Sequence, residues 1–342
     1  MDTWMKNFVF LKLICYFCDV NDLVINIYTK SKELPPLLTG NFFHSLEMFC
    51  IAEKVSGDTP YMAVASHEGK AVGQLLAVTH LSKNIFPPYI YTHAHVHGIG
   101  EYELGVEAEE IFPQLLHALT RKLRHACFYI EFSELSKKMF AYRHFRRMRY
   151  VPIAWQEIHN SLHSMAPEKR LSEKMLHRIK KIEEKGVETH EVKTEEDIQA
   201  FHKLLKHYYR LKLRQFTPRK EYFTEISRTE NAKLFLTTYH GKAIGGCTLI
   251  QCKGNAYLWH LASKRKTRAY LRPDMMTVWY AIKYAHKTGC RHIYFMDVGL
   301  PWKKNPYRDF ILSFGGKPVA KYRWFRIRPA IINWALKWMY KE

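Results

Sequence analysis

The chain has 342 residues, of which 47% are hydrophobic and 25% charged, a composition typical of a folded globular protein of about two domains. Seven scattered cysteines argue against a disulfide-rich scaffold and for a reducing, cytoplasmic compartment. No apolar run reaches the roughly 20 residues that a membrane-spanning helix needs. The formal charge of +21 favours an anionic partner, such as coenzyme phosphates, nucleic acid or an anionic membrane surface.

Residues 1–24 are expected to form an N-terminal extension. They contain an apolar stretch like that of a signal peptide, but Lys12 interrupts it and no small-residue cleavage site follows. The first half then shows a hairpin pattern at residues 63–76, a helix pattern at 110–125 and an aromatic strand at 128–132.

Three histidines, His93, His95 and His97, alternate along one segment and would place three imidazoles on one face of a strand. This spacing fits metal ligands, but no H-E-x-x-H motif accompanies it. A polar strand that lines a cleft and faces an acceptor is the favoured interpretation, and no metal is expected.

A basic, polar helix is predicted at residues 167–185, with an apolar stripe at Leu171, Met175, Ile179 and Ile182 and an end at Gly186. We interpret residues 161–186 as a rigid connecting helix. A strand at 187–192 and a helix at 195–214 then open the second half.

The core of the second half is predicted in four steps. Residues 234–250 form a hairpin around the His240-Gly241 turn, and a third strand follows at 255–260. A helix starts at Pro273, and a buried strand then ends at Asp297. A crossover helix between two strands that run in the same direction indicates a βαβ unit joined to an antiparallel sheet.

The two halves share landmarks in the same order. Gly69-Lys70 in the first half corresponds to Gly241-Lys242 in the second, each in a hairpin turn. Further along, Tyr142-Arg143-His144-Phe145 corresponds to Tyr307-Arg308-Asp309-Phe310 at a similar offset. Landmarks that recur in order at a nearly constant offset predict an internal duplication.

The order of elements resembles the core of the GNAT acyltransferase fold. Asp297-Val298-Gly299, followed by Phe310, Ile311, Phe314 and Gly315, resembles the end of a FemAB-type transferase domain, whose helix carries F-K-x-x-F-G. Ile311 stands at the position of the family's lysine. The resemblance implies an α/β (α+β) fold of tandem GNAT-like domains, each a mixed, mostly antiparallel sheet flanked by helices, at residues 25–160 and 187–328.

The resemblance also implies transfer of an acyl group, acetyl or aminoacyl, from acyl-CoA or aminoacyl-tRNA to an amine on a cell-envelope or polysaccharide precursor. Backbone N–H groups polarise the acyl carbonyl in that chemistry, and an acid or base handles the protons. The candidate catalytic residues are Asp297, His260 and Arg308; the candidate donor-binding residues are Lys264, Arg265, Lys266, Arg268 and Arg272; the candidate substrate-binding residues are Tyr257, Trp259 and Tyr307. The alternatives are a structural cap for Asp297, a surface arginine for Arg308 and a solvated basic turn for the loop at residues 263–272, which holds the donor-binding candidates.

Residues 329–342 are predicted to form an amphipathic C-terminal helix that begins at Pro329 and mixes Lys with Trp, Ile and Leu. It is too short to cross a bilayer, so it indicates either an interfacial anchor on the inner face of an anionic membrane or a helix docked on the sheet. An alternative function is a non-catalytic GNAT-like module that binds a polyanion, because residues 264–342 hold 18 Lys or Arg against 4 Asp or Glu.

Overall fold

The computed structural model describes residues 23–83, 88–210, 216–264 and 268–340. The first half contains these elements: β1 (Val24–Tyr28), α2 (Leu46–Lys54), β2 (Asp58–His67), β3 (Lys70–Lys83), β4 (Ile90–His97), β5 (Glu101–Tyr102), α3 (Ala108–Leu123), β6 (Tyr129–Leu135), α4 (Tyr142–Arg147) and β7 (Val151–Ser161). The short helices η2 (Ser31–Glu33) and η3 (Phe42–His44) precede α2.

The second half repeats this order after a connecting segment. The connector contains η4 (Pro167–Arg170) and α5 (Glu173–Glu183). The second half contains β8 (Val187–Glu191), α6 (Glu195–Tyr209), α7 (Lys220–Ser227), β9 (Ala232–Tyr239), β10 (Lys242–Cys252), β11 (Asn255–Ser263), η5 (Ala269–Leu271), α8 (Pro273–Lys287), β12 (His292–Phe295), α9 (Pro306–Leu312), β13 (Lys317–Ile327) and α10 (Ala330–Met339).

Matching turns and bulges support the predicted duplication. The β2–β3 turn at Gly69 and the β9–β10 turn at Gly241 both have positive φ, 78° and 69°, the backbone region that two-residue hairpin turns require and glycine adopts freely. Each following strand then has one residue outside the pairing register, Val72 in β3 and Ile244 in β10, at the same distance beyond its turn. Each half is a mixed, mostly antiparallel sheet flanked by helices, as predicted.

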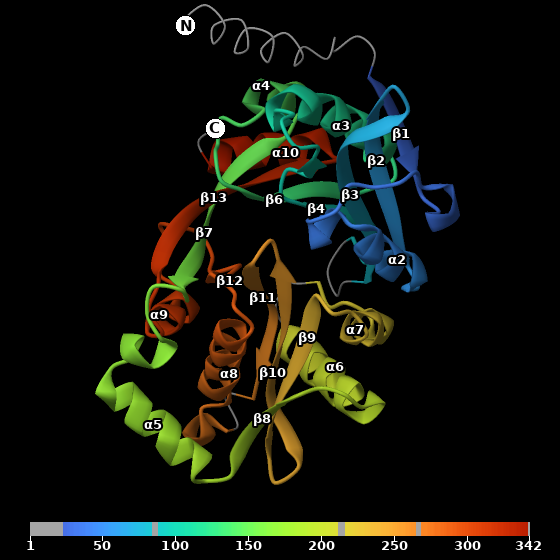
Figure 1. Ribbon diagram of the computed structural model, residues 1–342. Coiled ribbons are helices and arrows are strands. Elements are labelled where there is room, and N and C mark those ends of the chain that lie inside the picture. Colours follow the sequence, from blue (N-terminus) through green and yellow to red (C-terminus); the bar gives the residue numbers. More distant parts are fainter. Residues whose placement is uncertain (1–22, 84–87, 211–215, 265–267, 341–342) are drawn as a thin grey trace, which may run out of the picture.

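The two halves share one continuous sheet, with the order β1-β2-β3-β4-β6-β13-β7-β12-β11-β10-β9-β8. The last strand of the chain, β13, lies between β6 and β7, antiparallel to both. Strand β7, which closes the first half in sequence, pairs with β12 of the second half. The halves therefore exchange their final strands where they meet (Figure 1). The domain boundaries at 25–160 and 187–328 stay a prediction.

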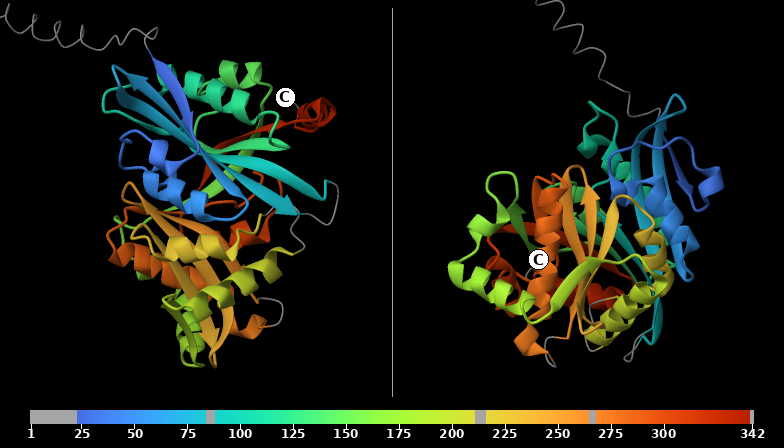
Figure 2. Two further views of the ribbon diagram at one scale, coloured as in Figure 1. Left: turned by 90° about the vertical axis from the view of Figure 1, so that its right-hand side faces the viewer. Right: turned by 60° about the horizontal axis from the view of Figure 1, so that its bottom comes forward.

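Helices cover both faces of the sheet in each half. In the first half α3 packs on one face, and α2 packs on the other face, against Met62 and Val64 of β2. In the second half α5 and α8 share one core, and α6 and α7 share another. Phe42 and Phe43 of the first half belong to the α6–α7 core, and α2 contacts α7 (Figure 2). An apolar interface therefore fixes the two halves against each other.

Two predicted elements have different bounds in the structure. The connecting helix is interrupted because the Ser172 side chain accepts a hydrogen bond from the Met175 N–H and starts a new helix there. Strand β12 ends at Phe295, so Asp297 lies beyond it, in the left-handed region at φ 62°. Strands β7 and β13 were not predicted. In the described residues, no helix is long and apolar enough to cross a membrane.

Replacement of Trp324 tests the exchanged strand. Trp324 on β13 is fully buried and stacks on Phe145 of α4, with ring centroids 4.6 Å apart. We expect Trp324→Ala to lower the free energy of unfolding by about 3–5 kcal/mol. Trp334→Ala, on exposed α10, should change it by less than about 0.5 kcal/mol. Urea unfolding of both variants measures this, and an equal effect would contradict a central role for β13.

Candidate functional site

An opening between β11 and β12 forms the centre of the site. The two strands pair in parallel only from Asn255–His292 to Leu258–Phe295. Strand β11 continues to Ser263, so the part of it after Leu258 separates from β12. The pairing of β10 with β11 also shifts register beside Trp259 and His260. Such a bulge interrupts regular pairing, and beyond Leu258 the edge of β11 that faces the opening has no described partner strand.

The corresponding strands of the first half stay paired. Strand β4 pairs with β6 up to its last residue, His97 opposite Ser133, and the Gly98 N–H then donates to the Ser133 carbonyl at 2.9 Å. The pairing of β3 with β4 runs without a register shift in the residues described. Of the two described pairs of central parallel strands, only that of the second half therefore has an open slot.

A cavity of about 210 Å³ lies beside the opening, between the two halves. The second half contributes Trp259, His260, Met296 and Asp297, and the α6–α7 segment contributes Tyr209 and Tyr222. From the first half the cavity is lined by these side chains: Phe43, Met48, Leu76, Val78, His80, His93, His95, His97, Tyr129, Glu131 and Ser133. The prediction that the three alternating histidines line a cleft is confirmed.

Burial holds four imidazoles of the cavity neutral, those of His93, His95, His97 and His260. Desolvation lowers the pKa of His95 and of His260 to about 3 each, with positively charged or imidazole neighbours as a second cause. It also lowers the pKa values of His93 and His97. The Nε2 atom of His260 is buried and has no hydrogen-bond partner in the described part of the chain. Among those residues, no group of three His, Cys, Asp or Glu is arranged to hold a metal ion.

Arg323 of β13 gathers carboxylates from both halves at one end of the cavity. Its guanidinium lies 3.2 Å from the Glu131 carboxylate, 3.7 Å from that of Glu134 and 3.6 Å from that of Asp297. The same guanidinium lies over the Trp155 ring at 4.2 Å. Glu134 and Asp297 both have positive φ, 63° and 62°, and belong to corresponding strands of the two halves, Glu134 near the end of β6 and Asp297 just after β12. Of the two, only Asp297 is among the described residues that line the cavity, and non-glycine residues held in this backbone region at a cavity are often functional.

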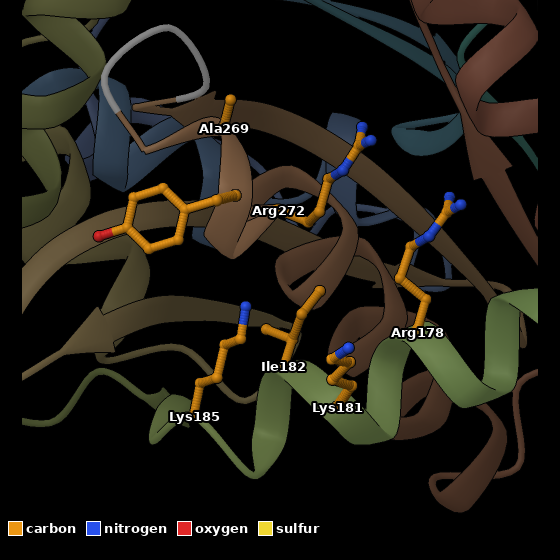
Figure 3. A pocket seen from close by; sticks show the side chains of 7 residues that line it. Arg178, Lys181, Ile182, Lys185, Ala269 and Arg272 are labelled. Atoms are coloured by element: carbon orange, nitrogen blue, oxygen red, sulfur yellow. The ribbon is translucent and has the colours of Figure 1, made fainter.

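A basic groove of about 900 Å³ lies on the face of the second half that α5 and α8 cover. Arg178, Lys181 and Lys185 of the α5 segment face Arg272 before α8 (Figure 3). Tyr270 also lines the groove, and the Lys185 ammonium lies 5.9 Å from its ring centroid. Among the described residues, the lining contains these four cationic side chains and no carboxylate, so the groove suits an anion.

The predicted site residues divide among the cavity, the basic groove and the protein interior. Trp259, His260 and Asp297 line the cavity, and Tyr257 packs beside it on Phe43, with ring centroids 5.2 Å apart. Arg272 lines the groove, and Arg268 donates to the Tyr270 hydroxyl at 3.2 Å.

The remaining predicted residues lie elsewhere. The backbone of Lys264 donates to the Ile244 carbonyl, and Arg265 and Lys266 lie outside the described residues. Tyr307 is half-buried near Tyr209, and desolvation of its hydroxyl raises its pKa. Arg308 donates to the Gln156 side chain at 2.7 Å and to the carbonyls of Leu300 and Lys303.

Sequence reasoning missed Glu131, Arg323 and the cations of α5. A glutamate on an aromatic strand and an arginine in a basic tail carry no local signal. The α5 cations did carry one, because a polar helix with this much positive charge between two domains has a face available for an anion.

The comparisons with known proteins agree with this geometry. Residues 169–304 match the model of the acetyltransferase (GNAT) domain. No curated protein sequence matches the chain. The resemblance to GNAT proteins is thus confirmed in the half that contains the open slot.

Solved structures show the same tandem fold. FemX is 13% identical, with a TM-score of 0.55, covering 91% of this chain and 96% of its own. The C-terminal domain of a putative lysylphosphatidylglycerol synthetase from Agrobacterium fabrum is 11% identical, with a TM-score of 0.56, covering 86% and 90%. A tandem GNAT protein from the clavulanic acid biosynthesis pathway is 11% identical, with a TM-score of 0.54, covering 89% and 99%. The predicted FemAB-like arrangement is therefore confirmed as a fold.

The neutral histidines predict a loss of stability in acid. For His95 the folded pKa of about 3 lies below the value of about 6.5 in unfolded chains. Between these values the unfolded state binds more protons, so stability falls as the pH falls from about 6.5 toward 3. We expect His95→Gln to reduce this slope by up to about 1.4 kcal/mol per pH unit.

Urea unfolding at several pH values from about 4.5 to about 7.5 measures this slope. His117→Gln, on the exposed face of α3, is the matched control and should leave the slope unchanged. The same slope in His95→Gln as in the unaltered protein would contradict the burial argument.

Proposed function

With a GNAT acetyltransferase domain at residues 169–304 as the premise, we propose that the second half transfers an acyl or aminoacyl group from an anionic donor to an amine. The observation that carries this proposal is the bulged opening of β11 away from β12 beside a buried cavity. An acyl group in the opening would meet the backbone of β11 beyond the end of its pairing with β12, and N–H groups there would stabilise the negative charge that develops on the acyl oxygen.

The donor is proposed to be acyl-CoA or aminoacyl-tRNA, with its phosphates in the basic groove. Strand β11 passes the opening and ends at Ser263, and three residues of the groove, Ala269, Tyr270 and Arg272, lie in the segment between β11 and α8. In this chain the Asp274 carboxylate accepts a hydrogen bond from the Met275 N–H at 3.0 Å. An anion in the first turn of α8 disfavours phosphates at the N–H groups of that turn, which supports placing them against the side chains of α5, Tyr270 and Arg272.

The acceptor is proposed to be an amine on a cell-envelope or polysaccharide precursor. The support is the fold shared with FemX and with the putative lysylphosphatidylglycerol synthetase domain. The cavity combines aromatic rings with carboxylates, which suits an ammonium on a compact group.

In this proposal Asp297 handles a proton and His260 accepts a hydrogen bond from the acceptor through its Nε2 atom. Arg308 is a positioning residue, because its bonds to the carbonyls of Leu300 and Lys303 hold the loop that follows Asp297. Tyr257 and Trp259 form the wall beside the opening, and Tyr307 packs behind it.

A non-catalytic module that binds a polyanion is the second candidate. The observation that favours it is Ile311, which stands at the family's lysine position and is fully buried. No charge acts on a donor from that position. The two functions differ in selectivity, since a polyanion binder shows a steep salt dependence without preference for a defined ester or thioester.

We also propose that the protein contacts an anionic membrane surface from the cytoplasmic side. Five large apolar side chains, which we name the tail patch, are more than half exposed: Trp302, Ile331, Trp334, Trp338 and Met339. The exposed Lys303 and Lys304 adjoin Trp302, and the Trp302 and Tyr340 rings lie 6.1 Å apart. Tryptophan beside lysine is typical of segments that lie in the membrane interface.

Charge removal in the groove tests the donor site. We expect Arg178→Ala with Lys185→Ala to raise the donor KM about tenfold or more and to change kcat less than about twofold, because the phosphates are bound equally in the ground and transition states. Initial rates with acetyl-CoA, longer acyl-CoAs and charged tRNA measure this. Lys174→Ala with Lys180→Ala removes the same charge from the same helix outside the groove, and an equal rise in KM there would contradict the assignment.

Replacement of the tail patch tests the membrane contact. We expect Trp334→Ser with Trp338→Ser to weaken co-sedimentation with vesicles containing phosphatidylglycerol by at least about tenfold, since burial of each large apolar side chain contributes about 1.5–3 kcal/mol. Leu104→Ser with Met139→Ser, exposed residues of the first half, is the control. Binding that is unchanged in the tryptophan variant would exclude this surface.

A further inference from the structure

The cavity between the halves contains a carboxylate that the proposed reaction has not yet used. Glu131 lies on β6 of the first half and lines the cavity together with Asp297 and Arg323. Its side chain is 15% exposed, and its carboxylate accepts a hydrogen bond from Arg323 at 3.2 Å. One guanidinium of the exchanged strand therefore contacts an acid from each half.

The charge of the cavity is opposite to that of the protein as a whole. The described lining holds two carboxylates, Glu131 and Asp297, against one guanidinium, that of Arg323, and burial keeps His95 and His260 neutral. His80 also lines the cavity and lies 2.9 Å from the Asp58 carboxylate. The cavity is thus a local negative site within a chain of charge +21. Such a field favours entry of a cation, and an amine acceptor arrives as an ammonium.

We propose that Glu131 is a catalytic residue supplied by the first half. Its carboxylate removes a proton from the acceptor ammonium, while Arg323 holds that carboxylate beside Asp297. This inference rests on the proposed acyl transfer and adds the group that makes the amine nucleophilic. It also explains why the first half faces the opening with a polar surface although its own central strands stay paired.

Glu131 is suited to this step by its surroundings. Arg323 and Asp297 face it from two other elements, and His95 lies opposite it in register on β4. Tyr129 is on its own strand, and Glu134 shares Arg323. Burial raises the pKa of Glu131, the Arg323 charge opposes this rise and Asp297 adds to it. A carboxylate with a raised pKa is a better base near neutral pH.

The step balances in protons and bonds. The Glu131 carboxylate takes one proton from R–NH₃⁺, and the R–NH₂ that forms attacks the acyl carbon. A C–N bond forms, and the C–S bond of a thioester or the C–O bond of an ester breaks. The leaving sulfur or oxygen takes the second proton from the nitrogen. Asp297, which lines the cavity just after β12, relays this proton. Glu131 then releases its proton to solvent.

The test compares two glutamates that share one arginine. Glu131→Gln should lower kcat by about 10²–10⁴-fold, the usual contribution of a general base, with the donor KM unchanged. Glu134→Gln removes a carboxylate from the same guanidinium, but Glu134 is not among the described residues that line the cavity, so it should retain kcat within about threefold. A threefold change in kcat corresponds to roughly 0.65 kcal/mol in activation free energy. Thermal unfolding of both variants reports any structural loss.

The pH dependence gives a second readout that a structural role does not move. In the unaltered protein, kcat should fall as the pH falls through the pKa of Glu131, because the protonated acid cannot accept the ammonium proton. This acidic limb should be absent from the residual activity of Glu131→Gln and present in Glu134→Gln. Glu131→Asp should restore part of kcat together with the limb.

The outcomes separate this inference from the proposed function. If the unaltered protein transfers an acyl group and Glu131→Gln matches Glu134→Gln in kcat and pH profile, the role of Glu131 is wrong and acyl transfer stands. If only Asp297→Asn removes the acidic limb, Asp297 is the sole base and the inference is again overturned. If the unaltered protein transfers no acyl group from any donor tested, the proposed function itself fails.

Discussion

The pairing of β13 with β6 on one edge and β7 on the other is the constraint on which the rest of the molecule depends. It joins two sheets into one and buries Trp324 against α4 of the first half. It also carries Arg323 to the point where acids from both halves converge. Without this strand, β6 and β7 would each expose an edge of unpaired backbone groups, which costs stability and invites association. The cavity is thus a product of the exchange rather than of either half alone.

Much of the fold follows from local sequence. The turns at Gly69 and Gly241 were predictable because a two-residue hairpin needs positive φ, and the start of α8 because proline suits a first helical turn. The exchange of β7 and β13 was not predictable, since a strand's partner depends on contacts far along the chain. Residues 317–327 fell inside the predicted domain at 187–328, but no strand was assigned to them. The charges of Lys321 and Arg323 in this segment are paired inside the molecule with Glu157 and Glu131.

The candidate site was predictable to a similar extent. Asp297 follows one core strand and His260 lies on another, in the region where the fold class places its chemistry, and the structure brings both to one cavity. Glu131 escaped notice because its importance arises only from Arg323, which is distant in the chain and close only in the fold. Donor binding was assigned to the loop before α8, whereas much of the lining of the basic groove comes from the α5 segment, whose cations look like an ordinary solvated face.

The exchanged strand also governs the order in which the molecule can assemble. During synthesis, β6 is complete long before β13 leaves the ribosome, so the first half must persist with an open edge while the connector and most of the second half are added. At about 5–20 residues per second this interval lasts roughly 10–40 s. Pairing across so long a stretch of chain is slow, and an unpaired edge is prone to associate with other chains. A chaperone that covers the edge of β6 would therefore be most useful before, rather than after, the second half has folded.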